Sequence, residues 1–293
     1  MTAVPNSAVP NAAVPDAAVP NSAVPNSPVP NIGMPGSAVP SITVPDGLPG
    51  WLKPLASALD DDLDPSSIAG PHRPRTMAGE ARRSAVLVLF AAGSDDSTGP
   101  DLLFAERAKT LRSHPGQPAF PGGKVDPGET VVETALREAQ EETDLDPSGV
   151  AVFGLLPELY LPPSDFLVAP VLAWWHTPSP VRVLDIREVA SVRRIPVSEL
   201  VDPANRFTVS HPSGRVGPGF AAGSLLIWGF TASLLDAVLR LGGWEREWDR
   251  QRHEPLPDDV VALAGLFGQR FAAPGGGVPG VSLSAFEEPG ENA

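Results

Sequence analysis

The sequence contains no cysteine, which excludes disulfide bonds, zinc–thiolate sites and thiol nucleophiles. Long apolar runs are also missing, because no stretch approaches the roughly 20 uninterrupted apolar residues that a membrane-spanning helix requires. The first positively charged side chain is Lys53, and no continuous apolar segment precedes it, so we expect no signal peptide. These absences predict a cytoplasmic protein that does not interact with a membrane.

Positive charge is scarce as well. Lys and Arg number 21 against 35 Asp and Glu, which gives a formal net charge of −14 at pH 7. A protein that holds nucleic acid through a broad basic face needs clustered positive side chains, so we expect no nucleic-acid partner. A small anionic ligand remains compatible with the composition if local cations, or a metal ion bound by acidic residues, counter the negative field.

Proline, by contrast, is abundant: the chain has 36, and they crowd near the N-terminus. From Pro5 to Pro45 a proline recurs every fifth residue, in units that are identical or similar to Ala-Val-Pro-Asn-Ser. Proline fixes φ and removes a backbone donor, so such a segment should be extended and solvated. We expect residues 1–49 to be a disordered proline-rich tail that acts as a spacer, as a docking strip for an aromatic groove, or in no discrete role.

Apolar patterning predicts one folded domain from residue 50 to residue 260. Strand-like runs occupy 84–91, 102–106, 150–156, 166–175 and 189–197, and the first two should form a hairpin. Helical spacing is found at 51–59 and at 230–239. The mixed order of elements indicates an α/β sandwich with a mixed sheet. Residues 261–293 should form a largely irregular extension.

A further helix is predicted over residues 129–143. Pro127-Gly128 breaks the preceding chain, and the acidic Glu129 suits the first helical turn. Its apolar stripe consists of Val132, Ala135, Leu136 and Ala139.

Another side of this helix carries carboxylates at i, i+3 and i+4, namely Glu138, Glu141 and Glu142. Like charges at this spacing repel each other, and a hard divalent cation such as Mg²⁺ would relieve the repulsion. The alternative interpretation is an ordinary solvated face on which Arg137 pairs with Glu141.

The segment from Gly123 to Leu145 resembles the box of the Nudix hydrolase family: Gly, five residues, Glu, seven residues, Arg-Glu, an aliphatic, any residue, Glu-Glu, any residue, Gly, an aliphatic. The matching positions are Gly123, Glu129, Arg137, Glu138, Ala139, Glu141, Glu142 and Leu145. Asp144 stands where the family has glycine. Because aspartate tolerates the left-handed conformation that ends a helix, we expect a slightly strained cap and an intact site.

The resemblance implies a Nudix-type α/β/α sandwich and Mg²⁺-dependent hydrolysis of a diphosphate bond, with Mn²⁺ as the alternative ion. The implied metal ligands are Glu138 and Glu142, assisted by Glu141. Arg137 would pair with Glu129 and fix the helix. Glu142 is the first candidate for activating the attacking water, and Glu188 is a weaker one, whose ordinary interpretation is a surface residue beside Arg187.

Upstream residues resemble the extended motif of the coenzyme A diphosphatase branch of this family. The matching residues are Arg107, Ala108, Leu111, Arg112, Gly116 and Phe120 to Gly123, whereas Phe104-Ala105 matches loosely. An arginine fork is well shaped to grip the phosphates of coenzyme A. The candidate substrate-binding residues are therefore Arg107, Arg112, Lys124, Gly122 and Gly123. The resemblance covers roughly residues 51–257.

This branch implies cleavage of coenzyme A or acyl-coenzyme A to 3′,5′-ADP and 4′-phosphopantetheine or its acyl form. Two alternatives stay open: the same chemistry on ADP-ribose, a dinucleotide or a nucleoside triphosphate, and a nucleotide-sensing module that binds without turnover. The complete set of box glutamates argues against the second alternative. A small-molecule nucleotide diphosphate is thus the expected partner, and a homodimer is left open.

Overall fold

The computed structural model of the protein describes residues 42, 44–59, 63, 68, 81–93, 99–111, 113–161, 165–211 and 214–268. The predicted N-terminal tail lies almost entirely outside these residues, as do Arg112 and the chain beyond residue 268. The described helices and strands belong to one compact unit that begins at Ser41. Within the described ranges, no helix combines the length and the apolar character needed to cross a membrane.

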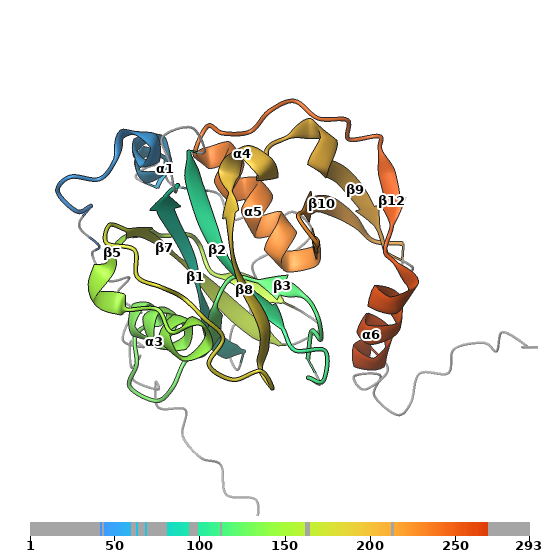
Figure 1. Cartoon of the computed structure of the whole chain (residues 1–293), viewed down its shortest axis with the longest axis horizontal. Helices are drawn as coiled ribbons and strands as arrows, with labels where there is room; N and C mark the ends of the chain where they lie inside the picture. Colours follow the sequence, from blue (N-terminus) through green and yellow to red (C-terminus); the bar gives the residue numbers. More distant parts are fainter. Residues whose placement is uncertain are drawn as a thin grey trace, which may run out of the picture. The chain divides into compact units, whose positions relative to one another are not determined.

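A mixed β-sheet is the main element of this unit (Figure 1). Strand β1 (Arg82–Ala92) runs antiparallel to β2 and parallel to β7, which confirms the predicted hairpin and the mixed sheet. The order is β3-β2-β1-β7-β5, with β8 paired to β2, β4 to β1 and β6 to β7. The remaining strands are β2 (Pro100–Arg107), β3 (Pro118–Ala119), β4 (Gly122–Lys124), β5 (Val150–Leu155), β6 (Leu159–Leu161), β7 (Phe166–Trp175) and β8 (Val189–Pro196).

Alternating side chains along β1 give this sheet two buried faces. One face packs on helix α3 (Val131–Thr143) through Ala85, Leu87, Leu89, Ala91, Val131, Ala135 and Ala139. The other packs on α1 (Lys53–Ala58) and α5 (Gly229–Leu241) through Val88, Phe90, Leu55, Leu234, Leu235 and Val238. Helices therefore cover both faces, and the predicted α/β/α sandwich is confirmed (Figure 1).

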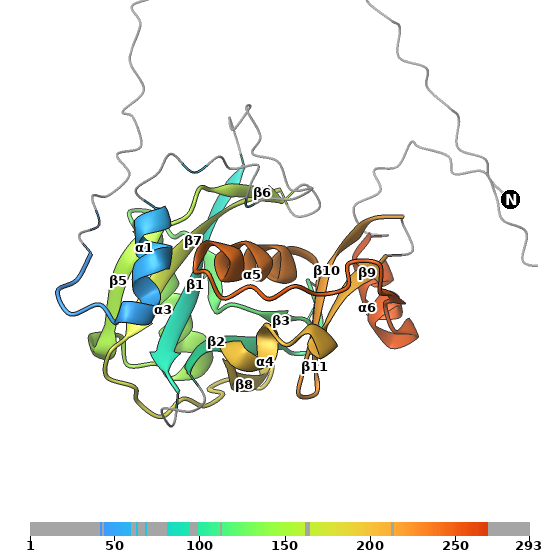
Figure 2. The same ribbon diagram turned by 90° about the horizontal axis from the view of Figure 1, so that it is seen from above.

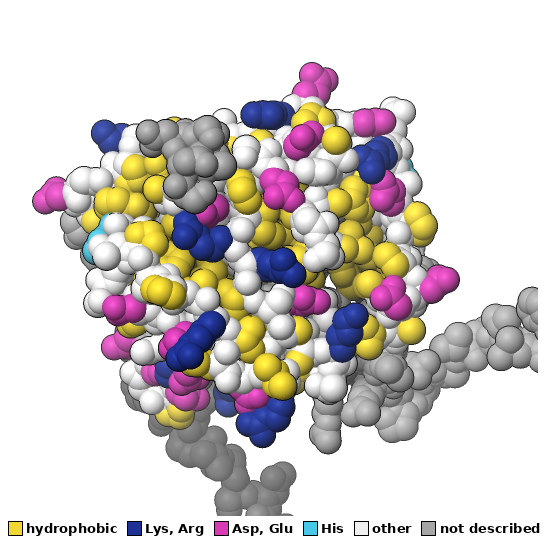
Figure 3. Space-filling view, in the orientation of Figure 1, with side chains coloured by type: hydrophobic (Ala, Val, Ile, Leu, Met, Phe, Trp, Pro, Cys, Tyr) yellow, Lys and Arg dark blue, Asp and Glu magenta, His cyan; other side chains and the backbone are white. Residues whose placement is uncertain are grey.

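A second, smaller sheet with the order β11-β10-β9-β12 follows later in the chain. Its strands are β9 (Arg206–Ser210), β10 (Val216–Ala222), β11 (Leu225–Ile227) and β12 (His253–Pro255). Phe207 and Val209 of β9 pack with Leu256 and with the first turn of helix α6 (Asp258–Gly268). Figures 1 and 2 both show α6 on the outer side of this sheet. On the face drawn in Figure 3, Lys and Arg side chains alternate with acidic ones and do not gather into one basic surface.

Arg206 ties the smaller sheet to α5. Its side chain is fully buried and forms an ion pair with Asp236 of α5. The guanidinium carbon lies 4.2 Å from the ring centroid of Phe220 and 4.5 Å from that of Trp248. A buried arginine needs such a counter-charge and such aromatic contacts, so this cluster holds β9 against the helix that covers the larger sheet.

The predicted strands and helices appear within a few residues of their expected bounds, including a short helical start made of η1 (Gly50–Leu52) and α1. The described chain also contains α4 (Val197–Leu200), η2 (Pro147–Gly149) and η3 (Pro203–Asn205). The extension predicted to be largely irregular from residue 261 begins with a helical segment, because α6 continues across that boundary to Gly268. Val260 and Val261 pack on the smaller sheet and so give this short segment a surface to fold against.

Candidate active site

A short loop connects the end of β4 at Lys124 to helix α3, and a capping box defines the start of the helix. The hydroxyl of Thr130 accepts a hydrogen bond from the backbone N–H of Glu133, and the Glu133 carboxylate accepts one from the N–H of Thr130. The helix therefore starts at Val131, two residues later than predicted. As a result Glu129 lies outside the helix, where its carboxylate can turn toward Arg137.

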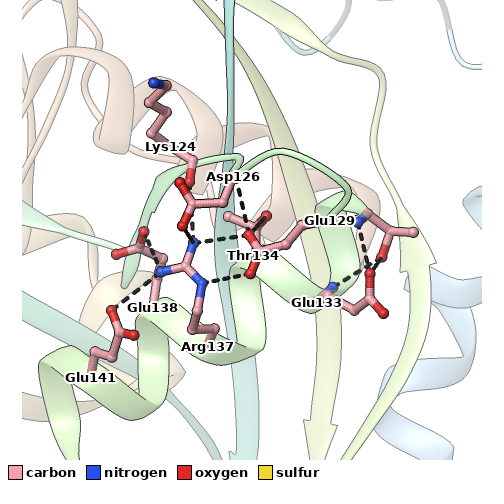
Figure 4. A network of polar contacts seen from close by, with 9 residues as sticks. Lys124, Asp126, Glu129, Glu133, Thr134, Arg137, Glu138 and Glu141 are labelled. Atoms are coloured by element: carbon pink, nitrogen blue, oxygen red, sulfur yellow. Dashed lines mark hydrogen bonds and ion pairs between the residues drawn. The ribbon is translucent and has the colours of Figure 1, made fainter.

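Arg137 is the centre of the polar network in Figure 4. Its Nε donates to Oε1 of Glu129 at 2.7 Å and its Nη2 donates to Oε2 at 3.0 Å, so the predicted pair with Glu129 is present in bidentate form. Nη2 also donates to the carbonyl of Lys124 at 3.2 Å, and Nη1 donates to Glu138 at 2.9 Å. One guanidinium thus joins the end of β4, the turn before α3 and the helix itself.

These contacts keep both partners charged. The hydrogen bonds from Arg137, followed by that from the Thr134 hydroxyl, lower the pKa of Glu129 to about 2. The same pairing raises the pKa of Arg137 above its ordinary value. An arginine–carboxylate fork of this geometry is among the stronger polar contacts in proteins, so the turn that carries Glu129 is held firmly against the helix.

Glu138 lies against β4, where Gly123 makes room for its carboxylate, while the neighbouring Gly122 lets β4 lie close to β1. A Cβ atom on Gly123 would lie 2.3 Å from Cδ of Glu138, and one on Gly122 would lie 2.3 Å from the carbonyl oxygen of Ala85. A side chain on Gly123 would push the helix away from the strand, and one on Gly122 would push β4 away from β1. Only 18% of the Glu138 side chain is exposed, and burial raises its pKa.

Glu142 lies one turn further along α3 and is buried more deeply, with 11% of its side chain exposed. Its Oε2 accepts a hydrogen bond from the backbone N–H of Gly122 at 3.1 Å, and its Oε1 is 3.9 Å from Nη1 of Arg107. Burial raises the pKa of Glu142 to about 7, against the opposing effect of Arg107. The negative charges of Glu138 and Glu188 add to the rise.

The other predicted site residues lie at different distances from this centre. Glu141 is 59% exposed and accepts a hydrogen bond from Arg137 at 3.2 Å, as in the alternative interpretation of the helix. Lys124 contributes its backbone carbonyl, while its side chain extends away from the guanidinium (Figure 4). The exposed Glu188 lies near enough to Glu142 to affect its pKa, and its carbonyl accepts from the N–H of Ala108. Arg112 lies outside the described residues.

Glu138 and Glu142 are suited to a divalent cation. Both carboxylates project from one side of α3, both are less than one-fifth exposed, and burial disfavours their charge. Among the residues that the structure describes, no three acidic or histidine side chains lie close enough to hold a metal ion by themselves. Mg²⁺ commonly binds through one or two carboxylates and completes its shell with water and phosphate oxygens, so this pair fits the ion.

The end of α3 has the left-handed residue that the sequence predicts. Asp144 has φ 57° and ψ 26°, and its N–H donates to the carbonyl of Gln140. Its carboxylate accepts a 2.7 Å hydrogen bond from Nε of Arg182, whose own N–H donates to the carbonyl of Thr143. Sequence reasoning missed Arg182 and the Thr134 hydroxyl, because the first is 38 residues from its partner and the second has no motif of its own.

Two substitutions at residue 144 test this cap. Asp144→Ala should lower the free energy of unfolding by about 1 kcal/mol, because alanine is strained at positive φ and has no side-chain oxygen to bond locally. Asp144→Gly should stay within about 0.5 kcal/mol of the wild type, since glycine removes the strain while the exposed ion pair with Arg182 contributes little. Urea unfolding at pH 7 measures both values. An alanine variant as stable as the wild type would refute strain at this position.

Glu142→Gln tests the burial of the carboxylate without any activity assay. The folded-state pKa of about 7 lies above the ordinary 4.5, so protonated Glu142 stabilises the fold below pH 4.5, and this contribution is lost as the pH rises through about 7. In metal-free buffer at pH 8 the variant should therefore be more stable than the wild type, by up to about 3 kcal/mol, and the gap should close toward pH 4.5.

The measurement is urea unfolding with a chelator from pH 4.5 to pH 8. Glu158→Gln is the matched control, because Glu158 is a surface carboxylate paired with Arg83. Added Mg²⁺ should stabilise the wild type at pH 8 more than it stabilises Glu142→Gln. A stability gap that does not change with pH would show that Glu142 is not buried in this way.

Comparison with known proteins identifies the family. A family profile described as the NUDIX domain matches residues 81–214. The chain is 36% identical over 141 residues to Nudix hydrolase 3 of Caenorhabditis elegans, an alignment that covers 47% of this chain and 58% of the worm protein. It is 37% identical over 190 residues to the uncharacterized Nudix hydrolase NudL of Cronobacter sakazakii, covering 63% of this chain and 95% of the relative.

Among solved structures, the chain resembles a Nudix hydrolase from M. smegmatis, RenU, with a TM-score of 0.41 and 18% identity over 58% of this chain and 91% of that one. A likeness of this size supports no assignment of its own, so the family rests on the sequence relatives. The coverage of these relatives agrees with the glutamates of α3 and with Gly123, which match the family's box. The chain therefore belongs to the Nudix hydrolase family.

Proposed function

We propose that this chain hydrolyses the diphosphate bond of coenzyme A or acyl-coenzyme A, adding water across the P–O–P linkage to release 3′,5′-ADP and 4′-phosphopantetheine or its acyl form. The observation that carries the proposal is the approach of Arg107 to Glu142, with 3.9 Å between Nη1 and Oε1. Arg107 belongs to the segment that resembles the coenzyme A diphosphatase motif. The contact therefore joins that segment to the candidate metal-binding helix.

The end of β2 that carries Arg107, and the loop that follows it, are well organised for an anion. The N–H of Gly116 donates to the carbonyl of Arg107, and the N–H of Arg107 donates to the carbonyl of Gln117. Nε of Arg107 donates to the carbonyl of Ser113 at 3.3 Å, and 28% of the side chain is exposed. An arginine held in this way needs little reordering before it contacts a phosphate oxygen, which favours its use in substrate binding.

Glu138 and Glu142 would hold a divalent cation, Mg²⁺ or Mn²⁺. When bound, the cation supplies neutralisation of the diphosphate oxygens and a lowered pKa for water. With a pKa of about 7 in the absence of the cation, Glu142 can exchange a proton near neutral pH, which suits a group that shares in activating water. Arg137 and Glu129 act as positioning residues, because they hold Glu138 and the preceding turn in place.

The test is incubation of the full chain with Mg²⁺ and, separately, coenzyme A, an acyl-coenzyme A, ADP-ribose and a diadenosine polyphosphate, with products identified by mass spectrometry. We expect 3′,5′-ADP and the pantetheine phosphate from the first two. Glu142→Gln should lower kcat by about 10²- to 10⁴-fold, because it removes a carboxylate from both metal binding and water activation.

Glu158→Gln serves as the control, since this surface residue is remote from α3 in sequence and pairs with Arg83. Turnover of ADP-ribose without turnover of coenzyme A would refute the substrate assignment but leave the diphosphatase chemistry. Full activity of Glu142→Gln would instead refute the assigned role of Glu142.

A further inference from the structure

We infer that helix α6 borders the substrate site beside the loop between β2 and β3, here called the Arg107 loop because it follows that residue. We also infer that Leu263 selects for substrates with an elongated apolar chain attached to the diphosphate. This inference deepens the proposed function and rests on it. Helix α6 (Asp258–Gly268) lies beyond residues 81–214, the part of the chain that matches the family profile. The specificity assigned to it is therefore a feature of this chain outside the matched domain.

Helix α6 contacts the Arg107 loop at Gly116. Gly116 has φ +67°, and a Cβ atom placed on it would lie 3.3 Å from Cγ of Lys109 and 3.7 Å from Cδ1 of Leu263. The aliphatic part of Lys109 and the end of Leu263 therefore both lie over the same backbone position. Because glycine presents no side chain there, these two groups form a short apolar strip along the loop.

The first turn of α6 also packs against the smaller sheet. Val260 and Val261 pack with Leu256 and with β9 of the smaller sheet. Figures 1 and 2 both show α6 beside that sheet. Since its first turn is held by the sheet, Leu263 in the next turn is held toward the loop.

The apolar strip made by Lys109 and Leu263 lies close in sequence to Arg107 of the candidate site. Arg107, which approaches Glu142, is the last residue of β2, and Lys109 lies two residues later in the loop that follows. The N–H of Gly116 donates to the carbonyl of Arg107. A group attached to a diphosphate bound at Arg107 can thus pass along Gly116 and meet the aliphatic part of Lys109 and Leu263. Methylene and amide groups, as in a pantetheine or acyl-pantetheine arm, match such a strip, whereas a compact polar sugar does not.

The experiment compares Leu263→Asp with Ala262→Asp. Ala262 is the neighbouring, exposed residue of α6, so the control introduces the same charge into the same helix. Leu263→Asp should raise KM for coenzyme A about tenfold, corresponding to about 1.4 kcal/mol of lost apolar contact, with kcat within about twofold of the wild type. It should also abolish any gain in kcat/KM on lengthening the acyl chain. Ala262→Asp should have the KM and kcat of the wild type, and the conservative variant Leu263→Met should keep a KM close to that of the wild type.

Each outcome decides the inference. Equal behaviour of Leu263→Asp and Ala262→Asp would overturn it, as would a variant that weakens coenzyme A and ADP-ribose equally, because a purely structural role of α6 would affect both. If the wild type cleaves ADP-ribose only, the proposed function fails, and the inference is then tested by calorimetric binding of coenzyme A. Leu263→Asp should weaken that binding about tenfold and Ala262→Asp should leave it unchanged, whereas equal binding by the two variants would overturn the inference. Should the wild type turn over neither compound, calorimetric binding of coenzyme A to the wild type and Leu263→Asp gives the same comparison.

Discussion

The guanidinium of Arg137 joins three segments of the chain, and the geometry of the active site depends on it. Its fork holds Glu129, which precedes the helix, while its remaining contacts reach Glu138 and the carbonyl of Lys124 on β4. A planar fork accepts a carboxylate in one orientation, so the turn between strand and helix has little freedom. Glycine at 123 then lets the carboxylate of Glu138 lie directly against the strand.

This close packing has an electrostatic cost. Glu138 and Glu142 lose most of their hydration, and their pKa values rise, yet Arg137 and Arg107 compensate the two charges only in part. A helix selected for stability alone would carry neutral side chains at these positions. The carboxylate pair is therefore arranged to attract positive charge, whereas Arg107 places a positive charge beside it, next to the loop that leads toward Leu263.

Much of this arrangement could be predicted from the sequence, because the box spacing encodes local geometry. The pairing of Arg137 with Glu129 was implied by the resemblance to the family's box, and the left-handed Asp144 by the box glycine that it replaces. The exact start of α3 was missed, although the capping box at Thr130 was available as a signal. Arg182, the short strands β9 to β12 and the contact of α6 with Gly116 arise from residues far apart in sequence. Their spacing carries no local periodicity strong enough to reveal them.

The central proposal is that Glu138, held by Arg137, and Glu142, held by the Gly122 N–H beside Arg107, bind the same divalent cation. A crystal grown with Mn²⁺ tests it most directly through the anomalous signal of the ion. The account predicts a peak about 2.1 Å from carboxylate oxygens of both Glu138 and Glu142, with the Arg137–Glu129 fork unchanged. A peak that contacts neither glutamate, or saturating Mn²⁺ without any peak on this side of α3, would contradict it.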